Sequence, residues 1–175
     1  IEKRGKVIVG LDDSFVPMGF RERDGKLVGY DIDLAKAVFK QYGIKVDFQT
    51  IDWSMNVTEL RNGTIDLLWN GYSITPERQK KVAFSKPYLR NRQVIVVKKD
   101  SGISSFKQMK NYELGMQTGS TAEQWYETKQ DVLHAKKTVL YDTISNSFLD
   151  LNAGRIQGIL LDEVYADYYI AHMAK

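Results

Sequence analysis

The chain has 175 residues, which is enough for one domain or two small lobes built around a hydrophobic core. With 43% hydrophobic residues, 27% charged residues and only three prolines, its composition argues against disorder and against a fibrous repeat. The absence of cysteine excludes a thiol nucleophile, a disulfide framework and any Cys-ligated metal site.

The 25 basic and 22 acidic residues are scattered along the chain and leave a net charge of +3. Because this charge forms no concentrated positive field, nucleic acid is not an expected partner. No apolar run approaches the roughly 20 residues of a membrane span, and the chain opens with Ile-Glu-Lys-Arg instead of an apolar signal core. We therefore expect a cytoplasmic or an already processed protein.

The first half of the chain alternates short apolar strands with amphipathic helices. Residues 7–11 predict a buried strand, and the Asp24-Gly25 dipeptide predicts a tight turn between the two arms of a hairpin. Asp31 is the expected N-cap of a helix that ends at Gly43. Further along, the pattern predicts a strand over 46–51, a helix over 53–61, a strand over 65–69 and a helical turn that starts at Pro76.

The second half repeats the alternation after a long β-rich run. Strands are predicted over 93–98, 113–116, 139–140 and 159–161, and helices over 122–129, 144–152 and 163–173. Strands that alternate with helices imply parallel sheets with helical crossovers, so the fold class is α/β. We expect a first lobe over 1–87, a hinge crossing over 88–92 and a second lobe over 93–175.

The usual catalytic motifs are absent from this sequence. There is no phosphate-binding glycine loop, no dinucleotide-binding fingerprint and no nucleophile elbow. The two imidazoles, His134 and His172, lie away from the strand ends and are read as surface or helix residues. We therefore predict no enzyme activity, no cofactor and no metal.

Polar and aromatic groups gather where ligands bind in α/β sheets, beyond the carboxyl ends of the strands. Four of these groups have an ordinary structural reading beside the functional one. Arg78 is either a surface ion pair or a carboxylate clamp, and Asp162 is either a helix N-cap or a ligand group. Asp12 either caps a turn or contacts a ligand. Ser120 begins a capping-box pattern whose helix N-terminus also suits a carboxylate.

Six segments in order resemble the extracytoplasmic amino-acid-binding proteins of ABC importers. They read DDSFVP from Asp12, GYDIDLA from Gly29, NGYSITPER from Asn70, FSKPY from Phe84, QTGST from Gln117 and AGRIQGILLD from Ala153. The resemblance implies a two-lobed periplasmic-binding-protein-like clamshell whose lobes close on a free amino acid. It also implies an extracytoplasmic location, in the periplasm or at the cell surface as a lipid-anchored protein, and the membrane permease of the importer as partner.

The resemblance assigns a binding role to eleven positions of this sequence. Arg78 would grip the α-carboxylate of the ligand, and Asp162 would pair with the α-ammonium. Phe15 and Trp53 would sandwich the ligand side chain, and Asp12 and Gln117 would contact its far end. The remaining positions would help to hold the carboxylate: Asn70, Gly71, Ser73, Ser120 and Thr121.

The sequence departs from the family pattern because it stops after the helix that follows Asp162. The family continues with a further strand, a second crossing and a closing segment, so we expect an incomplete second lobe and a missing return crossing. A domain-swapped or truncated-form dimer is one way to cover the exposed apolar surface. Two other functions are considered, a dehydratase-like enzyme of the same architecture and the ligand-sensing domain of a receptor.

Overall fold

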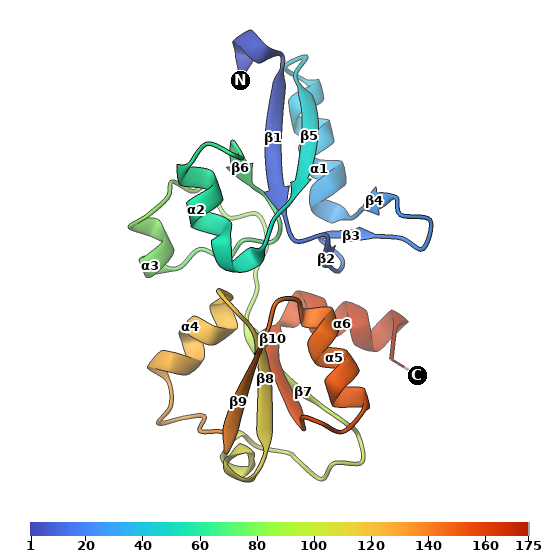
Figure 1. Ribbon diagram of the computed structural model, residues 1–175, viewed down its shortest axis with the longest axis vertical. Helices are drawn as coiled ribbons and strands as arrows, with labels where there is room; N and C mark the ends of the chain where they lie inside the picture. Colours follow the sequence, from blue (N-terminus) through green and yellow to red (C-terminus); the bar gives the residue numbers. More distant parts are fainter. Residues whose placement is uncertain (175) are drawn as a thin grey trace. The chain divides into compact units, whose positions relative to one another are not determined.

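A computed structural model describes residues 1–174 of the chain, which forms two compact units (Figure 1). Unit 1 runs from Ile1 to Arg90, and unit 2 begins at Asn91. The boundary falls inside the segment 88–92 that the sequence predicts as a crossing. The role of this segment as a hinge stays a prediction.

Unit 1 is built on a parallel sheet of three strands in the order β5-β1-β6. Its strands are β1 (Lys6–Leu11), β5 (Lys45–Thr50) and β6 (Leu67–Leu68). In β1 the side chains of Val7, Val9 and Leu11 are fully buried, because alternate residues of the strand face the core. The strand predicted over 65–69 is shorter than expected, since only two residues pair with β1.

A second, antiparallel sheet of unit 1 confirms the predicted hairpin. It joins β2 (Ser14–Phe15), β3 (Gly19–Arg21) and β4 (Leu27–Val28). The helical elements of the unit are η1 (Glu2–Arg4), α1 (Tyr30–Lys40), η2 (Trp53–Met55), α2 (Asn56–Arg61) and α3 (Pro76–Gln79). The predicted helical turn at Pro76 is confirmed, with the Thr75 hydroxyl accepting the backbone N–H of Arg78.

The start of α1 differs from the prediction. Its N-cap is Gly29, not Asp31, and Asp31 lies in the first turn. The Asp31 side chain is fully buried and accepts hydrogen bonds from the backbone of Gly71 and from the hydroxyl of Tyr88. A capping side chain bonds its own helix, whereas this carboxylate bonds residues 40 and 57 positions away along the chain.

Unit 2 is a four-stranded sheet in the order β7-β10-β8-β9, with its helices drawn around it in Figure 1. Its strands are β7 (Gln93–Val97), β8 (Glu113–Gln117), β9 (Lys137–Tyr141) and β10 (Gly158–Asp162). The pairs of β8 with β9 and with β10 are parallel, as expected, while β7 is antiparallel to β10. Its helical elements are η3 (Phe106–Asn111), α4 (Thr121–Thr128), α5 (Ile144–Asn152) and α6 (Glu163–His172).

The strands and helices of unit 2 are held together by a buried apolar core. Met109, Leu114 and Leu133 are fully buried, and Met116 and Leu160 are almost so, in one apolar cluster. Burial of such side chains stabilises a fold by about 2 kcal/mol each. η3, which the sequence did not predict, contributes Met109 to this cluster.

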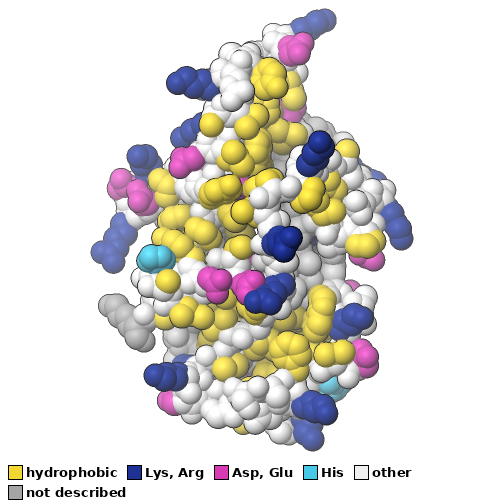
Figure 2. Space-filling view, turned by 180° about the vertical axis from the view of Figure 1, so that it is seen from behind, with side chains coloured by type: hydrophobic (Ala, Val, Ile, Leu, Met, Phe, Trp, Pro, Cys, Tyr) yellow, Lys and Arg dark blue, Asp and Glu magenta, His cyan; other side chains and the backbone are white. Residues whose placement is uncertain are grey.

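The surface carries charges of both signs. On the face drawn in Figure 2, acidic and basic side chains are interspersed, and the basic ones form no extended patch. His134 and His172 are exposed, in agreement with their reading as surface residues. Within residues 1–174, no helix has the length and apolar character needed to cross a membrane.

Candidate ligand-binding site

One of the predicted ligand residues of unit 1 is a buried arginine. Arg78 is 4% exposed, and its Nη1 donates to the carbonyl of Ser73 at 3.0 Å. Its guanidinium carbon lies 4.0 Å from the centre of the Tyr72 ring, well within the range of a cation–π contact. This burial contradicts the reading of Arg78 as a surface residue. The loop before α3 holds this guanidinium in place.

Aromatic side chains surround Tyr72 and fix the ring on which Arg78 lies. Trp53 meets it edge-on with ring centres 5.6 Å apart, and Phe84 stacks on it at 5.6 Å. Its hydroxyl donates to the side-chain oxygen of Asn56 at 3.3 Å. Burial raises the pKa of Tyr72 and the charge of Arg78 opposes this rise, so the phenol stays neutral at physiological pH. Of this aromatic group, the sequence predicted only Trp53 as a ligand residue.

The carboxyl ends of β1 and β6 bring further predicted residues together. The backbone N–H of Asp12 donates to Asn70 Oδ1 at 3.2 Å. The ring of Phe15 lies so close to Gly71 that a Cβ added there would stand 3.3 Å from Phe15 Cε1. The Asp12 carboxylate accepts from the N–H and the hydroxyl of Ser14, at 2.9 and 2.6 Å. Asp12 therefore caps a turn, and its contact with a ligand stays a prediction.

In unit 2 the predicted residues lie where β8 ends and α4 begins. Gln117 is buried and donates to the carbonyl of Asp142 at 2.9 Å. The Ser120 hydroxyl donates to the Gln117 carbonyl and accepts from the N–H of Glu123, as an N-cap does. Glu123 bonds back to the N–H of Gly119. The predicted cap is thus confirmed, and Thr121 is the first residue of the capped helix.

Asp162 ends β10 and stands at the N-cap position of α6. Its side chain makes no capping hydrogen bond to that helix. Its Oδ1 accepts instead from the amides of Asn91 and Gln93, at 2.7 and 2.6 Å. Gln93 is its direct partner across the antiparallel pair of β10 with β7. No local sequence pattern indicates these two partners, because they lie 71 and 69 positions from Asp162 along the chain.

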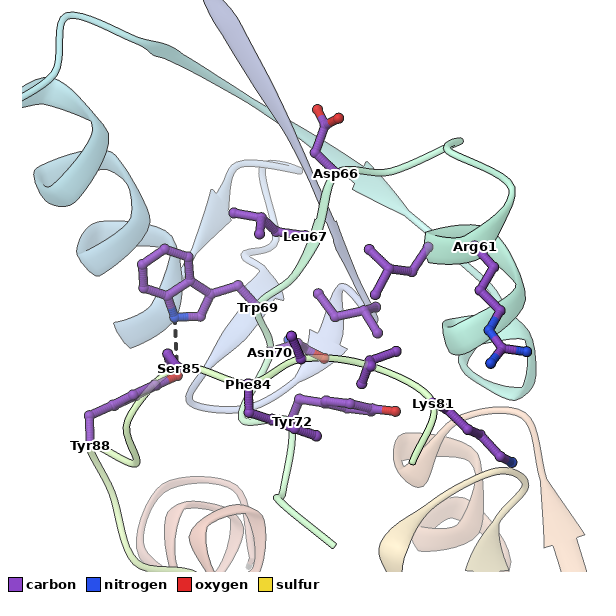
Figure 3. A pocket seen from close by; sticks show the side chains of 14 residues that line it. Arg61, Asp66, Leu67, Trp69, Asn70, Tyr72, Lys81, Phe84, Ser85 and Tyr88 are labelled. Carbon is purple, nitrogen blue, oxygen red and sulfur yellow. Dashed lines mark hydrogen bonds between the residues drawn. The ribbon is translucent and has the colours of Figure 1, made fainter. Parts of the chain in front are cut away.

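A groove lies beside β6 in unit 1, with a volume of about 550 Å³. Its walls include Leu67, Trp69 and Phe84, and Figure 3 shows the charged groups of Arg61 and Lys81 away from this aromatic wall. Arg78 is not among the lining residues. The predicted carboxylate clamp therefore lies outside this groove. Within residues 1–174, no group of three or more His, Asp or Glu side chains is placed to hold a metal ion.

The fold and the two sets of strand-end residues define the class of the protein. Residues 7–161 match the family of bacterial extracellular solute-binding proteins, family 3. The chain belongs to this family, and its members are extracellular or periplasmic proteins. The predicted α/β fold of this class is confirmed.

The individual relatives are proteins that bind amino acids. The ABC transporter arginine-binding protein 1 of Escherichia coli is 33% identical over 94% of this chain. A substrate-binding protein of Streptococcus pneumoniae, solved with bound histidine, is 46% identical over 97% of this chain, with a TM-score of 0.93. An ancestral amino-acid-binding protein, a precursor of cyclohexadienyl dehydratase, is 35% identical over 98% of the chain, with a TM-score of 0.91.

The chain is shorter than these relatives. It spans 66% of the Escherichia coli protein, 71% of the Streptococcus pneumoniae chain and 76% of the ancestral chain.

Proposed function

We propose that this protein binds a free amino acid with a polar side chain and delivers it to the membrane permease of an ABC importer. Arg78 of unit 1 binds the α-carboxylate, with the loop of Asn70, Gly71 and Ser73 as its frame. Asp162 of unit 2 binds the α-ammonium, and Ser120 and Thr121 add donors for the carboxylate. Arginine and histidine are the first ligands to test, because relatives of the chain bind them.

The observation that carries this proposal is the setting of Arg78. Its guanidinium is 4% exposed and is held by the Ser73 carbonyl and by the Tyr72 ring, so it has a fixed place in the loop before α3. The planar fork of arginine donors matches the two oxygens of a carboxylate. A guanidinium fixed in this way is suited to bind the α-carboxylate of an amino acid.

Calorimetric titration of the chain with the common amino acids tests the proposal. Micromolar affinity corresponds to about 8 kcal/mol. Replacement Arg78→Ala should remove about 2 to 5 kcal/mol of that, because a ligand charge would be left buried and unpaired. The matched control is Arg61→Ala, which removes an exposed arginine of the same unit and should leave the affinity unchanged. If none of the common amino acids binds the wild-type chain, the proposal is wrong.

We infer further that binding is the whole activity and that no chemistry follows. A dehydratase of the same architecture would need a general acid or base that is free to act on its substrate. The Asp162 carboxylate already accepts two amide hydrogen bonds and, in this proposal, takes the ammonium of the ligand. Incubation with a cyclic dienyl acid, followed by mass spectrometry, should show unchanged substrate. Turnover would make the protein an enzyme.

A further inference from the structure

The carboxylate of Asp31 is buried in unit 1. The residue is fully buried, and this burial raises the pKa of the carboxyl group even though its hydrogen bonds act to lower it. Its Oδ2 accepts the backbone N–H of Gly71 at 2.6 Å, and its Oδ1 accepts the hydroxyl of Tyr88 at 2.6 Å. Such short bonds to an ionised acceptor are about twice as strong as neutral ones.

The bond to Gly71 reaches the residues that hold Arg78. Gly71 has a φ of +57°, a left-handed conformation that most side chains disfavour. Tyr72, the next residue, carries the ring that lies against the guanidinium, and the following Ser73 supplies the carbonyl that accepts from Arg78. Because three consecutive residues make these contacts, the position of the Gly71 N–H sets where the ring and the carbonyl lie.

The bond to Tyr88 ties the same loop at a second point. The Tyr88 hydroxyl also accepts the indole N–H of Trp69 at 3.1 Å, drawn as the dashed line in Figure 3. Trp69 and Gly71 are therefore both linked to one pair, the Asp31 carboxylate and the Tyr88 phenol. Tyr88 is 44% exposed, but burial and the nearby carboxylate raise the pKa of its hydroxyl, which stays protonated and donates.

We propose that Asp31 is a positioning residue for amino-acid recognition, which locks the loop of residues 69–73 so that Arg78 meets the ligand carboxylate. This inference rests on the proposed function, since it names a residue that positions the loop in contact with Arg78. Without the lock, the loop populates other conformations, and the apparent Kd rises by the inverse of the fraction that remains competent.

Replacement Asp31→Asn breaks the lock with almost no change of volume. An amide has one acceptor oxygen and one donor nitrogen, so it can satisfy the Gly71 N–H or the Tyr88 hydroxyl but not both as they stand. The Tyr88 oxygen already accepts from Trp69, so it is a poor acceptor for a second N–H group. If about one tenth of the molecules keep the competent loop, the Kd rises about tenfold.

The milder variant Tyr88→Phe removes one of the two bonds and leaves the Gly71 bond in place. Because one of the two bonds remains, we expect the loss of binding free energy to be about half of that in Asp31→Asn. This corresponds to a rise in Kd of about threefold. Tyr30→Phe is the matched control. It removes a neighbouring hydroxyl from a ring stacked on Tyr88, and among residues 1–174 that hydroxyl has no hydrogen bond to Asp31. It should leave the Kd unchanged.

The experiment is calorimetric titration of wild type and the three variants with arginine and histidine, together with ¹H–¹⁵N spectra of the unliganded proteins. The amide proton of Gly71, bonded to a carboxylate, should shift upfield in Asp31→Asn, and the Kd should rise with it. A shifted Gly71 signal with an unchanged Kd would show that the bond is only structural and would overturn the inference alone.

The remaining outcomes also decide the question. If Asp31→Asn does not fold, Tyr88→Phe carries the test, and a Kd equal to that of Tyr30→Phe would overturn the inference. If wild type binds neither arginine, histidine nor any other common amino acid, the proposed function fails and takes the inference with it. Binding by wild type that is weakened in Asp31→Asn and Tyr88→Phe supports both.

Discussion

Gly29→Ala should destabilise unit 1 strongly, because this glycine makes the turn that places Asp31. Gly29 has a φ of +137°, a region that is almost closed to residues with a side chain. A Cβ at this position would stand 2.3 Å from the Met18 carbonyl oxygen and 2.9 Å from the backbone nitrogen of Gly19. Both obstacles are backbone atoms, so no rotation of a side chain relieves the overlap.

The cost follows from two contributions. The disfavoured backbone conformation costs about 1 to 3 kcal/mol. Moving Met18 aside also weakens the 3.0 Å hydrogen bond from the N–H of Asp31 to its carbonyl, which is worth about 1 kcal/mol. Gly29→Ala should therefore cost about 3 kcal/mol of the free energy of unfolding of unit 1. Gly25→Ala is the matched control, since Gly25 has a φ of +85° and no atom within 4 Å of the added Cβ. Its cost should be about 1 kcal/mol.

Urea unfolding followed by tryptophan fluorescence measures this difference. Two of the three tryptophans, Trp53 and Trp69, lie in unit 1, so a Trp125→Phe background makes the signal specific for that unit. Two compact units need not unfold together, which is why a specific signal matters. Equal costs for Gly29→Ala and Gly25→Ala would refute the steric reasoning, since the two glycines share a positive φ and differ mainly in what the Cβ meets.

Four further predictions follow from the site and the fold. Burial raises the pKa of Asp31, so its carboxyl group binds a proton more tightly in the folded protein than in the unfolded chain. Protonation of Asp31 therefore stabilises the folded state. This stabilisation is present in full below about pH 4 and is lost as the pH rises through the raised pKa. Wild type should therefore gain stability relative to Asp31→Asn as the pH falls from 7 towards 4, and urea unfolding at several pH values would contradict this if the difference stayed constant. Asp12→Ala should change the order of affinities for glutamine, arginine and histidine, whereas an unchanged order in calorimetry would make Asp12 structural. Phe148→Ala should cost unit 2 about 3 to 5 kcal/mol in thermal or urea unfolding, because Phe148 is 3% exposed and stacks on Tyr169 with ring centres 3.7 Å apart. A domain-swapped dimer predicts twice the 20.1 kDa mass of the chain in light scattering, and a monomeric mass at all concentrations would exclude it.

The sequence by itself determined most of the strands and helices of this fold, although not η3. A short apolar run marked β1, and the Asp24-Gly25 turn marked the hairpin, because both patterns are local and depend on a few neighbouring residues. The capping role of Ser120 was equally visible, since a cap and its helix lie within four residues. The order of the six segments was enough to suggest the family, to which the chain belongs.

Only the tertiary structure decided what the buried polar side chains do. Asp31 was predicted to be a helix cap, but its carboxylate accepts a hydrogen bond from the backbone N–H of Gly71. Asp162 was predicted to be either a cap or a ligand group, and its carboxylate accepts hydrogen bonds from the side-chain amides of Asn91 and Gln93. The physical reason is that a side chain cut off from water must find its partner wherever the fold brings one. That partner is set by sheet register and loop packing between residues tens of positions apart, which no local pattern records.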